Sequence, residues 1–549
     1  MLKKFFLIIC VALLVTGCGG GDSSSDKKLS VMLGSNVVSL DSAKCTDSAS
    51  FEVIADCIDG LMQLDADGKA IPAIAESFDV SADGKTYTFH LRDAKWSNGD
   101  DVTADDFVFA WRRHCQKSDK YAYIMGDTVA CVKNADAVTK GADPKTLGVN
   151  APDPKTFVVE LDAPVPFFPA LMSFPTFYPI NEKFYNSLDA DTYGTTPETF
   201  LSNGTFVLSE YLPGSANIQL KKNDSYWNAA NVKLDNWQYQ VVTSSDNALT
   251  AFKNGTLNIV DIGGSQIESV QKDAELSKNL QSIPSGELSY ISFNQDPKNH
   301  HAGALANVNL RLAISNAIDR ESLADNFVAN GSKATYTAIP LHFAPNATTG
   351  KYFAEDQKQF ADYVGFDVEK ARAWLDTAKS ELGKDSFELE FIYSNDSGNT
   401  VVKVAQAIKS QVEENLPGVV IKLQPMPKAE YFDRLTSNSF DLAISGWVPD
   451  YDDPMTFFSL WTTAGSEICE HWSNADYDKI IADCTTGNLA ADYDARWAAM
   501  YDAEKILLEN AVIAPLYTGV NSMLIAPNVS GIEFHVAGVN RVFKNVTVK

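Results

Sequence analysis

Three aspartates crowd around two aromatic residues in the stretch SGWVPDYDDPMTFF, which begins at Ser445. Asp453 directly precedes Pro454, which is typical of a helix start, because an aspartate cap accepts from free backbone N–H groups and proline has none to satisfy. Asp450 has no such local explanation. A cation that leaves water needs an opposite charge, so a carboxylate beside Trp447 is suited to the positive end of a ligand. From these residues alone a solvated turn residue is the favoured interpretation of Asp450, with a partner of a ligand cation as the alternative.

The N-terminus, MLKKFFLIICVALLVTGCGGGDSSSDKK, is organised like an export signal. Two lysines form a basic region, and the apolar run from Phe5 to Val15 is too short to span a bilayer. The small residues before Cys18 resemble the lipobox of bacterial lipoproteins. This predicts that residues 1–17 are a signal peptide and that Cys18 becomes the lipid-modified first residue, followed by a solvated tether over residues 18–28. A plain secretory signal is the alternative.

Six cysteines remain once Cys10 leaves with this signal and Cys18 is acylated. Export predicts an oxidising compartment, and no CxxC pair or Cys/His cluster has zinc spacing, so structural disulfides are favoured over metal ligation. Six thiols allow many connectivities, and their order alone does not choose among them. The order suggests three local pairs: Cys45 with Cys57, Cys115 with Cys131, and Cys469 with Cys484.

Charge and motifs exclude several classes of function. A formal net charge of -26 disfavours nucleic-acid binding, which rests largely on clusters of Lys and Arg. The sequence contains no GxSxG elbow, HExxH motif, P-loop or GxGxxG motif, and the adjacent His300 and His301 lie in a polar PKNHHAG stretch. We expect neither an enzyme nor a metal or cofactor site, and no nucleic-acid partner.

Strand and helix patterns alternate along the chain. KLSVMLG predicts a strand and FEVIADC a helix. The block SADGKTYTFHLRDAKWSNGDDVTADDFVFAWRR predicts a turn, a half-buried strand through Phe89, a second turn, and a helix capped by Thr103 with Asp105 and Asp106 in its first turn. At 549 residues the chain is too long for one core, and the mixed order favours an α/β protein of several lobes.

Three of these stretches resemble the extracytoplasmic peptide-binding proteins of ABC importers, the oligopeptide-binding family (bacterial extracellular solute-binding protein family 5). They are the block from Ala75 to Arg113, the helix that ends in NAIDRESL, and FDLAISGWVPDYDDPMTFF. LRDAKWSNGDDVTADDFVFAW is similar to the signature region of the family. The resemblance covers nearly all of the mature chain.

The resemblance implies an α/β, bilobal periplasmic-binding-protein fold, with two lobes around a hinge and an extra inserted domain. Lobe one would consist of residues 29–58, 202–286 and 519–549, the inserted domain of 59–201, and lobe two of 287–518. A ligand between such lobes is held in extended form, as a strand added to an exposed edge, so main-chain bonds supply affinity without reading side chains.

The resemblance also assigns residues to the ligand in lobe two. Asp450 lies where the family pairs an aspartate with the α-ammonium of the peptide. The backbone around Gly446 and Val448 would pair with the ligand main chain, and Trp447 would wall a side-chain pocket or else pack in the core. Tyr517 resembles a tyrosine that lines the cleft.

Two further positions are implied on the facing side of the cleft. Ser48 and its neighbours lie where the family offers main-chain groups from lobe one. Tyr121 resembles another cleft tyrosine, although an alignment gap lies near it.

Two departures from the family leave ligand length open. Where peptide-binding enterobacterial members have an arginine just before the GW pair, this chain has Ile444 and Ser445; where they have a tryptophan before FLD, it has Lys428 before YFD. That arginine helps to receive the C-terminal carboxylate of the ligand. Lys428 offers a positive charge in its place, with an exposed lysine as the equal alternative.

The resemblance implies a ligand-capturing lipoprotein of an ABC importer, which binds short peptides in a closed cleft and delivers them to a membrane permease. We expect a monomer, held by its lipid anchor in the periplasm or on the outer face of the cytoplasmic membrane. A non-peptide solute is the alternative, because relatives bind nickel complexes, haem, sugars or opines. A secreted hydrolase and a surface adhesin are less favoured, since their motifs and repeats are absent from the sequence.

Overall fold

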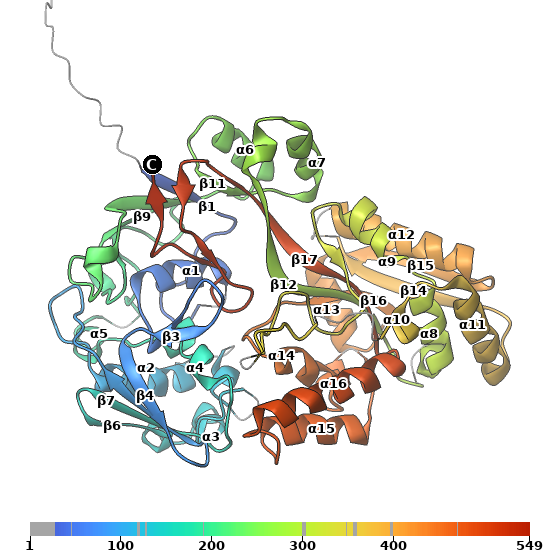
Figure 1. Cartoon of the computed structure of the whole chain (residues 1–549), viewed down its shortest axis with the longest axis horizontal. Helices are drawn as coiled ribbons and strands as arrows, with labels where there is room; N and C mark the ends of the chain where they lie inside the picture. The colour runs from blue at the N-terminus through green and yellow to red at the C-terminus, as the bar shows by residue number, and fades with distance from the viewer. Residues whose placement is uncertain are drawn as a thin grey trace, which may run out of the picture.

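The structure is a computed structural model of the whole chain (Figure 1). It describes residues 28–45, 47–117, 121–126, 129–189, 191–298, 303–346, 349–354, 360–395, 399–468 and 470–549. The predicted signal peptide, Cys18 and most of its tether lie outside the described residues, as do His300, His301 and Cys469. Among the helices of the described part, none combines the length and the hydrophobicity that a membrane span requires.

One large mixed sheet runs through both halves of the molecule. Its order is β15-β14-β16-β12-β17-β11-β1-β10-β9-β8, with β13 paired to β17. In that order the strands are Val419–Met426, Phe387–Ser394, Leu442–Trp447, Leu280–Phe293, Ile513–Ile525, Ile259–Asp261, Leu29–Leu33, Asn236–Val241, Asn217–Lys222 and Phe206–Glu210, and β13 is Lys333–Ala334. We call the side that holds β1 and β8 to β11 lobe one, and the side that holds β14 to β16 lobe two.

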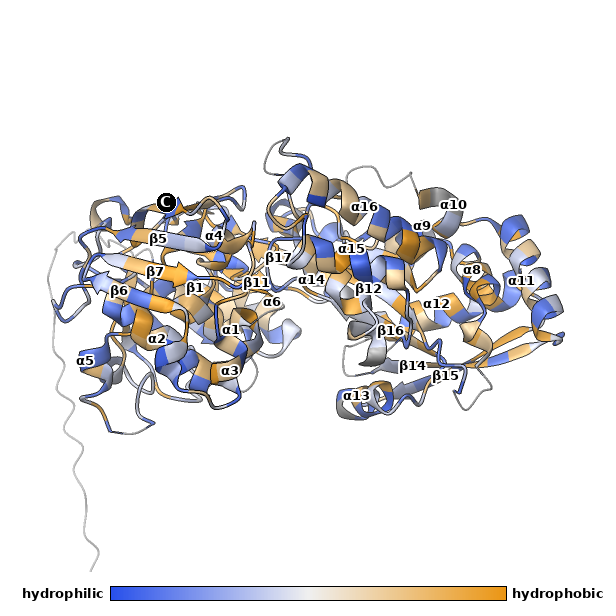
Figure 2. Ribbon diagram, turned by 90° about the horizontal axis from the view of Figure 1, so that it is seen from below, coloured by the Kyte–Doolittle hydropathy of each residue, from blue (hydrophilic) through white to orange (hydrophobic). Residues whose placement is uncertain are grey.

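Two long strands join the lobes, as Figures 1 and 2 show. The first half of β12 pairs with the end of β17 near lobe one, and its second half pairs with β16 in lobe two. The β12–β17 register shifts between Pro284 and Leu288. Gly286 lies in this shift with a φ of 68°, a left-handed conformation that favours glycine. The shift interrupts the regular pairing of the two strands where they pass from lobe one to lobe two.

A second, smaller sheet lies beside lobe one and has the order β4-β5-β7-β6. We call the chain between β3 and β8 the small-sheet region. The sheet strands are Ala75–Val80, Thr86–Leu91, Thr156–Glu160 and Val149–Asp153; short pairs elsewhere are Met62–Leu64 with Ala70–Pro72 (β2, β3), Val529–Ser530 with Thr547–Val548 (β18, β21) and Glu533–Phe534 with Arg541–Val542 (β19, β20).

Helices cover the sheets. Lobe one has α1 (Ser48–Cys57), α6 (Ser245–Lys253) and α7 (Gly264–Lys272); the small-sheet region has α2 (Ala104–Lys117), α3 (Ala135–Thr139), α4 (Phe168–Leu171) and α5 (Glu182–Tyr185). Lobe two has α8 (Val308–Asn316), α9 (Arg320–Ser322), α10 (Ala361–Val364), α11 (Val368–Leu382), α12 (Asn399–Asn415), α13 (Lys428–Thr436), α14 (Met455–Phe458), α15 (Ala475–Thr485) and α16 (Tyr493–Glu509).

The predicted α/β class is confirmed, and the local patterns of the small-sheet region explain its elements. Strand β5 buries alternate residues, as its period of two requires. At the start of α2 the Asp106 carboxylate accepts from the Thr103 backbone N–H at 2.9 Å and from the Trp96 indole N–H at 3.0 Å. A side-chain carboxylate thus satisfies a backbone donor at the helix start.

The predicted disulfides are not formed among the described cysteines, which carry buried thiols. Cys45 precedes α1 and Cys57 ends it, so a ten-residue helix of about 15 Å separates them, whereas bridged Cα atoms lie within about 7 Å. The Cys115 thiol contacts the Met125 sulfur at 3.5 Å, and its predicted partner Cys131 instead lines a cavity. The Cys484 thiol contacts the carbonyl oxygen of a residue in α16 at 3.7 Å, and its predicted partner lies outside the described residues.

Candidate ligand-binding site

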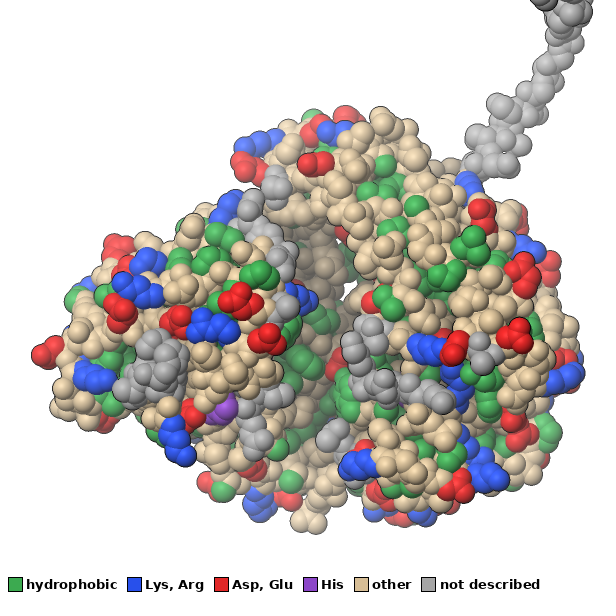
Figure 3. Space-filling model, turned by 180° about the vertical axis from the view of Figure 1, so that it is seen from behind, with side chains coloured by type: hydrophobic (Ala, Val, Ile, Leu, Met, Phe, Trp, Pro, Cys, Tyr) green, Lys and Arg blue, Asp and Glu red, His purple; other side chains and the backbone are tan. Residues whose placement is uncertain are grey.

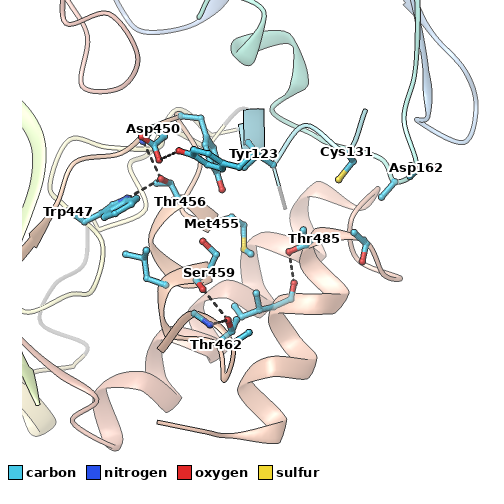
Figure 4. Close-up of a pocket in the computed structure, with 18 residues that line it drawn as sticks. Tyr123, Cys131, Asp162, Trp447, Asp450, Met455, Thr456, Ser459, Thr462 and Thr485 are labelled. Carbon is cyan, nitrogen blue, oxygen red and sulfur yellow. Dashed lines mark hydrogen bonds between the residues drawn. The ribbon is translucent and has the colours of Figure 1, made fainter. Parts of the chain in front are cut away.

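A threonine of α14 holds the loop that follows β16. The Thr456 hydroxyl oxygen accepts from the Asp450 backbone N–H at 3.2 Å and from the Trp447 indole N–H at 3.3 Å (Figure 4). Both residues therefore have fixed positions at the wall of the same cavity. The short polar side chain of Thr456 positions a carboxylate and an aromatic ring together.

A tyrosine from the small-sheet region reaches the Asp450 carboxylate. The Tyr123 hydroxyl donates to Asp450 Oδ2 at 2.6 Å across 327 positions of sequence. Next to this bond, the rings of Phe167 and Tyr451 stack with their centroids 4.7 Å apart. The small-sheet region and lobe two therefore meet at Asp450.

Asp450 lacks a cationic partner among the described residues, although it is largely buried. Burial raises the pKa of Asp450 above its usual value, and the hydrogen bond from Tyr123 offsets part of this rise. No ion pair links the Asp450 carboxylate to a described Lys or Arg. Asp453, three residues later, is bonded in bidentate fashion by Arg496 at 2.7 and 2.8 Å. The stretch thus holds one aspartate with an internal cation and one without.

Two cavities meet at Trp447. The first, of about 1020 Å³, lies between the small-sheet region and α14 and α15, and Asp450, Tyr123 and Met455 line it. The second, of about 490 Å³, lies within lobe two and borders α13, β12 and β17. Figure 3 shows the groove between the lobes from behind. Because Trp447 lines both cavities, its ring forms part of the wall between them.

One edge of β16 is open where the cavities meet. Strand β14 pairs with β16 only at Leu442 and Ala443, and beyond Ala443 the structure describes no strand partner on that side. Gly446 is exposed, and so is Val448, at 51%. An open strand edge carries backbone N–H and C=O groups that an extended peptide can use, which is the geometry of β-augmentation.

Comparisons with known proteins agree with this geometry. The profile of the bacterial extracellular solute-binding proteins, family 5 (middle), matches residues 69–467. The chain belongs to this family. It is 30% identical over 557 residues to the dipeptide-binding protein of Lactococcus lactis subsp. cremoris, covering 99% of this chain and 98% of that protein.

Two solved structures illustrate the likeness. The peptide-bound OppA of Listeria monocytogenes has a TM-score of 0.74 at 30% identity and covers 96% of this chain and 99% of that one. The unliganded open form of the murein tripeptide binding protein MppA has a TM-score of 0.79 at 28% identity and covers 96% of this chain and 98% of that one. The family 5 protein described here is therefore a bilobal binding protein and not an enzyme.

The predicted ligand residues of lobe two gather around the two cavities of this family 5 protein. Asp450 lines the first cavity, Trp447 lines both, and the second is lined by Gly446, Val448, Lys428 and Tyr517. Their contact with a ligand stays a prediction. Lys428 lies near Phe432, with Nζ 5.9 Å from the ring centroid.

The predicted residues of the facing side lie outside these two cavities. Ser48 is exposed as the first residue of α1, and Tyr121 packs with its ring 5.4 Å from that of Phe51. Tyr123, two residues after Tyr121, is the tyrosine that reaches Asp450, and sequence reasoning missed it. The YAY pattern held the only signal, since it offers two tyrosines at the position of the alignment gap.

Proposed function

We propose that this chain captures short peptides in the groove between its lobes and delivers them to the permease of an ABC importer. The observation that carries the proposal is the open edge of β16, which ends at Trp447, where the two cavities meet, three residues before Asp450. A peptide added to this edge would place alternate side chains on opposite faces of the sheet. Its main chain would supply affinity that does not depend on the peptide sequence.

Asp450 would receive the α-ammonium of the peptide. The Tyr123 hydroxyl occupies one of its carboxylate oxygens, and a carboxylate accepts several hydrogen bonds, so the ammonium can bind the other oxygen. Trp447 would wall the side-chain cavities on either side of the ligand. The dipeptide-binding and peptide-bound relatives support this ligand class.

The hinge would close the lobes on the ligand. We propose lobe boundaries at residues 286/287 and 518/519, with the inserted domain over residues 59–201. In support, the β12–β17 register shifts between Pro284 and Leu288, and a Cβ on Gly519 would lie only 2.9 Å from Ser285 Oγ. Small residues at this point leave room for the change in backbone direction.

We further propose that the protein is an exported monomeric lipoprotein anchored through Cys18, in the periplasm or on the outer face of the cytoplasmic membrane. The basic, apolar and small-residue segments before Cys18 support this. Replacement of Cys18 by Ser should release the protein from membranes. A variant that fractionates with membranes to the same extent would refute the lipid anchor.

Native mass spectrometry of the purified protein tests the ligand class. A ladder of bound masses that differ by amino-acid residues is expected for a peptide-binding protein of low sequence selectivity. A single bound mass that corresponds to a metal complex, a sugar or another non-peptide solute would contradict the proposal.

A further inference from the structure

Glu287 lies at the hinge with its carboxylate in the second cavity. It follows Gly286 in the register shift of β12 and lines the cavity with Ser289 and Tyr517. A Cβ atom on Gly446 would lie 3.4 Å from Glu287 Oε1, and one on Gly519 would lie 2.9 Å from Oε2. The Glu287 carboxylate therefore lies beside Gly446 and Gly519, neither of which has a side chain that could cover it.

No described side chain pairs with this carboxylate. Among the described residues it has neither a hydrogen bond nor an ion pair, and the Glu287 backbone N–H donates to Ser285 Oγ at 3.3 Å. Burial raises the pKa of Glu287, and burial with this neighbouring charge raises the pKa of Tyr517 to about 12. A carboxylate that leaves water without a partner costs free energy, which a cation supplied by a ligand would recover.

Glu287 lies close to the predicted site for the peptide N-terminus. A Cβ atom on Gly286 would lie 3.0 Å from the ring of Pro449, so the residues directly before Glu287 and Asp450 touch. An extended peptide advances about 3.3 Å per residue. A peptide whose ammonium binds Asp450 therefore passes Glu287 within its first few residues.

The second acidic residue of the cavity, Glu470, is placed differently from Glu287. Ser289 pairs with Gly446 and Tyr290 with Ser445, so Glu287 and Ser289 share one face of the sheet and Tyr290 has the other. On that other face, Glu470 Oε1 accepts from the Ser292 hydroxyl at 2.6 Å. The Glu470 carboxylate thus has a hydrogen-bond donor within the fold, whereas the Glu287 carboxylate has none among the described residues.

We propose that Glu287 is a specificity-determining residue that binds a basic side chain, Lys or Arg, near the N-terminus of the bound peptide. The ammonium or guanidinium group bonds the carboxylate over Gly446 and Gly519. Tyr517, which lines the same cavity and is 9% exposed, contacts the alkyl stem of the side chain. The proposal rests on the proposed function, because it names the ligand class of the same groove.

Calorimetry with alanine peptides tests the proposed function and the role of Glu287 separately. Dialanine, trialanine and tetraalanine first establish which length binds, which tests the proposed function. In that length, Lys, norleucine or Glu then replaces each alanine in turn. Lys is expected to bind about tenfold tighter than norleucine at one position, and Glu weaker than norleucine at that position, because a buried carboxylate gains a charge-assisted bond from Lys and repels Glu.

The isosteric variant Glu287→Gln sharpens the test. It should reduce the ratio of Lys to norleucine affinity at that position to about one while norleucine affinity stays within a few-fold. The matched control is Glu388→Gln, which removes the same charge from a side chain of β14 that is 70% exposed and should leave the ratio unchanged.

Three outcomes overturn the inference. If alanine and norleucine peptides bind but Lys gives no advantage at any position, the inference fails while the proposed function stands. If Glu287→Gln weakens all peptides equally, Glu287 is a structural residue of the hinge. If no alanine peptide of any length binds and no Lys peptide does, the proposed function and the inference fail together. The wild-type comparison of Lys, norleucine and Glu decides the question even where the variant does not fold.

Discussion

Asp450 and Asp453 lie three residues apart and have opposite electrostatic surroundings. Asp453 is 4% exposed, forms two hydrogen bonds with Arg496, and also accepts from the Met455 backbone N–H at 3.0 Å. Asp450 lines a cavity, and among the described residues its carboxylate accepts a hydrogen bond only from the Tyr123 hydroxyl. The first carboxylate has its cation within the fold, whereas the second has no cation among the described residues, and we propose that a ligand supplies it.

The same contrast extends through the molecule. Two buried carboxylates outside the groove have an arginine each, in Asp41–Arg113 at 2.5 Å and Glu52–Arg541 at 2.8 Å. A missing cation is not sufficient evidence of a ligand, because buried Glu504 accepts only backbone N–H groups and its pKa is raised to about 8. A missing cation beside a cavity and an open strand edge is the combination that indicates ligand binding.

The largest expected effect concerns stability. Asp453→Asn should lower the free energy of unfolding by about 3 to 5 kcal/mol, because it leaves the Arg496 charge buried without its partner. Asp450→Asn should leave that free energy nearly unchanged or raise it slightly at neutral pH, since burial raises the Asp450 pKa and its ionised form therefore destabilises the folded state. Urea unfolding followed by tryptophan fluorescence compares the two variants. Equal losses of stability would contradict the division between the two aspartates.

The second effect concerns binding. Asp450→Asn should weaken peptides with a free N-terminus by about 2 to 5 kcal/mol, because a charge pair inside a closed groove loses one partner. It should affect N-acetylated peptides far less, since acetylation removes the ammonium charge.

Calorimetry on both proteins with both ligands forms a double-mutant cycle that separates the pairwise coupling from general damage to the groove. A coupling energy near zero, with the fold intact by circular dichroism, would make Asp450 a turn residue.

Local patterns in the sequence predict local structure well here. The alternation of buried residues in β5 and the Asp106 carboxylate at the start of α2 each depend on a few neighbouring residues. Both the strand and the helix form as predicted. Asp450 was found through resemblance to a family and not through any pattern of its own, because a single carboxylate in a loop has no periodicity.

Contacts between distant residues could not be predicted in this way. The partner of Asp453 lies 43 positions away in α16, and Tyr123 lies 327 positions from Asp450. The predicted pairs Cys45–Cys57 and Cys115–Cys131 are not formed in the structure, and spacing along the chain does not reveal that α1 stands between Cys45 and Cys57. The Cys469–Cys484 pair stays a prediction, because Cys469 lies outside the described residues. The role of Tyr121 at the cleft stays a prediction, and resemblance did not point to Tyr123, because an alignment gap carries no geometry.

The third effect is a pH dependence of peptide affinity. In the proposed function the ionised form of Asp450 receives the ammonium, so affinity should fall as the pH drops through the pKa of Asp450 in the free protein. Burial raises that pKa, so the loss should begin at a higher pH than for an exposed aspartate and reach about 1.4 kcal/mol per pH unit. Calorimetry between pH 4 and pH 7 measures this, with the peptide ammonium charged throughout. An equal loss for the N-acetylated peptide would assign the titration to another group.

The smallest effect distinguishes the two roles that Tyr123 can have. Its hydroxyl stabilises the ionised Asp450 carboxylate and thereby lowers the pKa, so Tyr123→Phe should move the loss of peptide affinity to higher pH. At pH 7 the variant should bind within about 1 kcal/mol of the wild type, because Tyr123 is 42% exposed and water can replace its hydroxyl. Phe is the matched replacement, since it keeps the ring and removes only the donor. Tighter binding by Tyr123→Phe at every pH would show instead that the hydroxyl competes with the peptide ammonium for Asp450, and that the ligand must displace it.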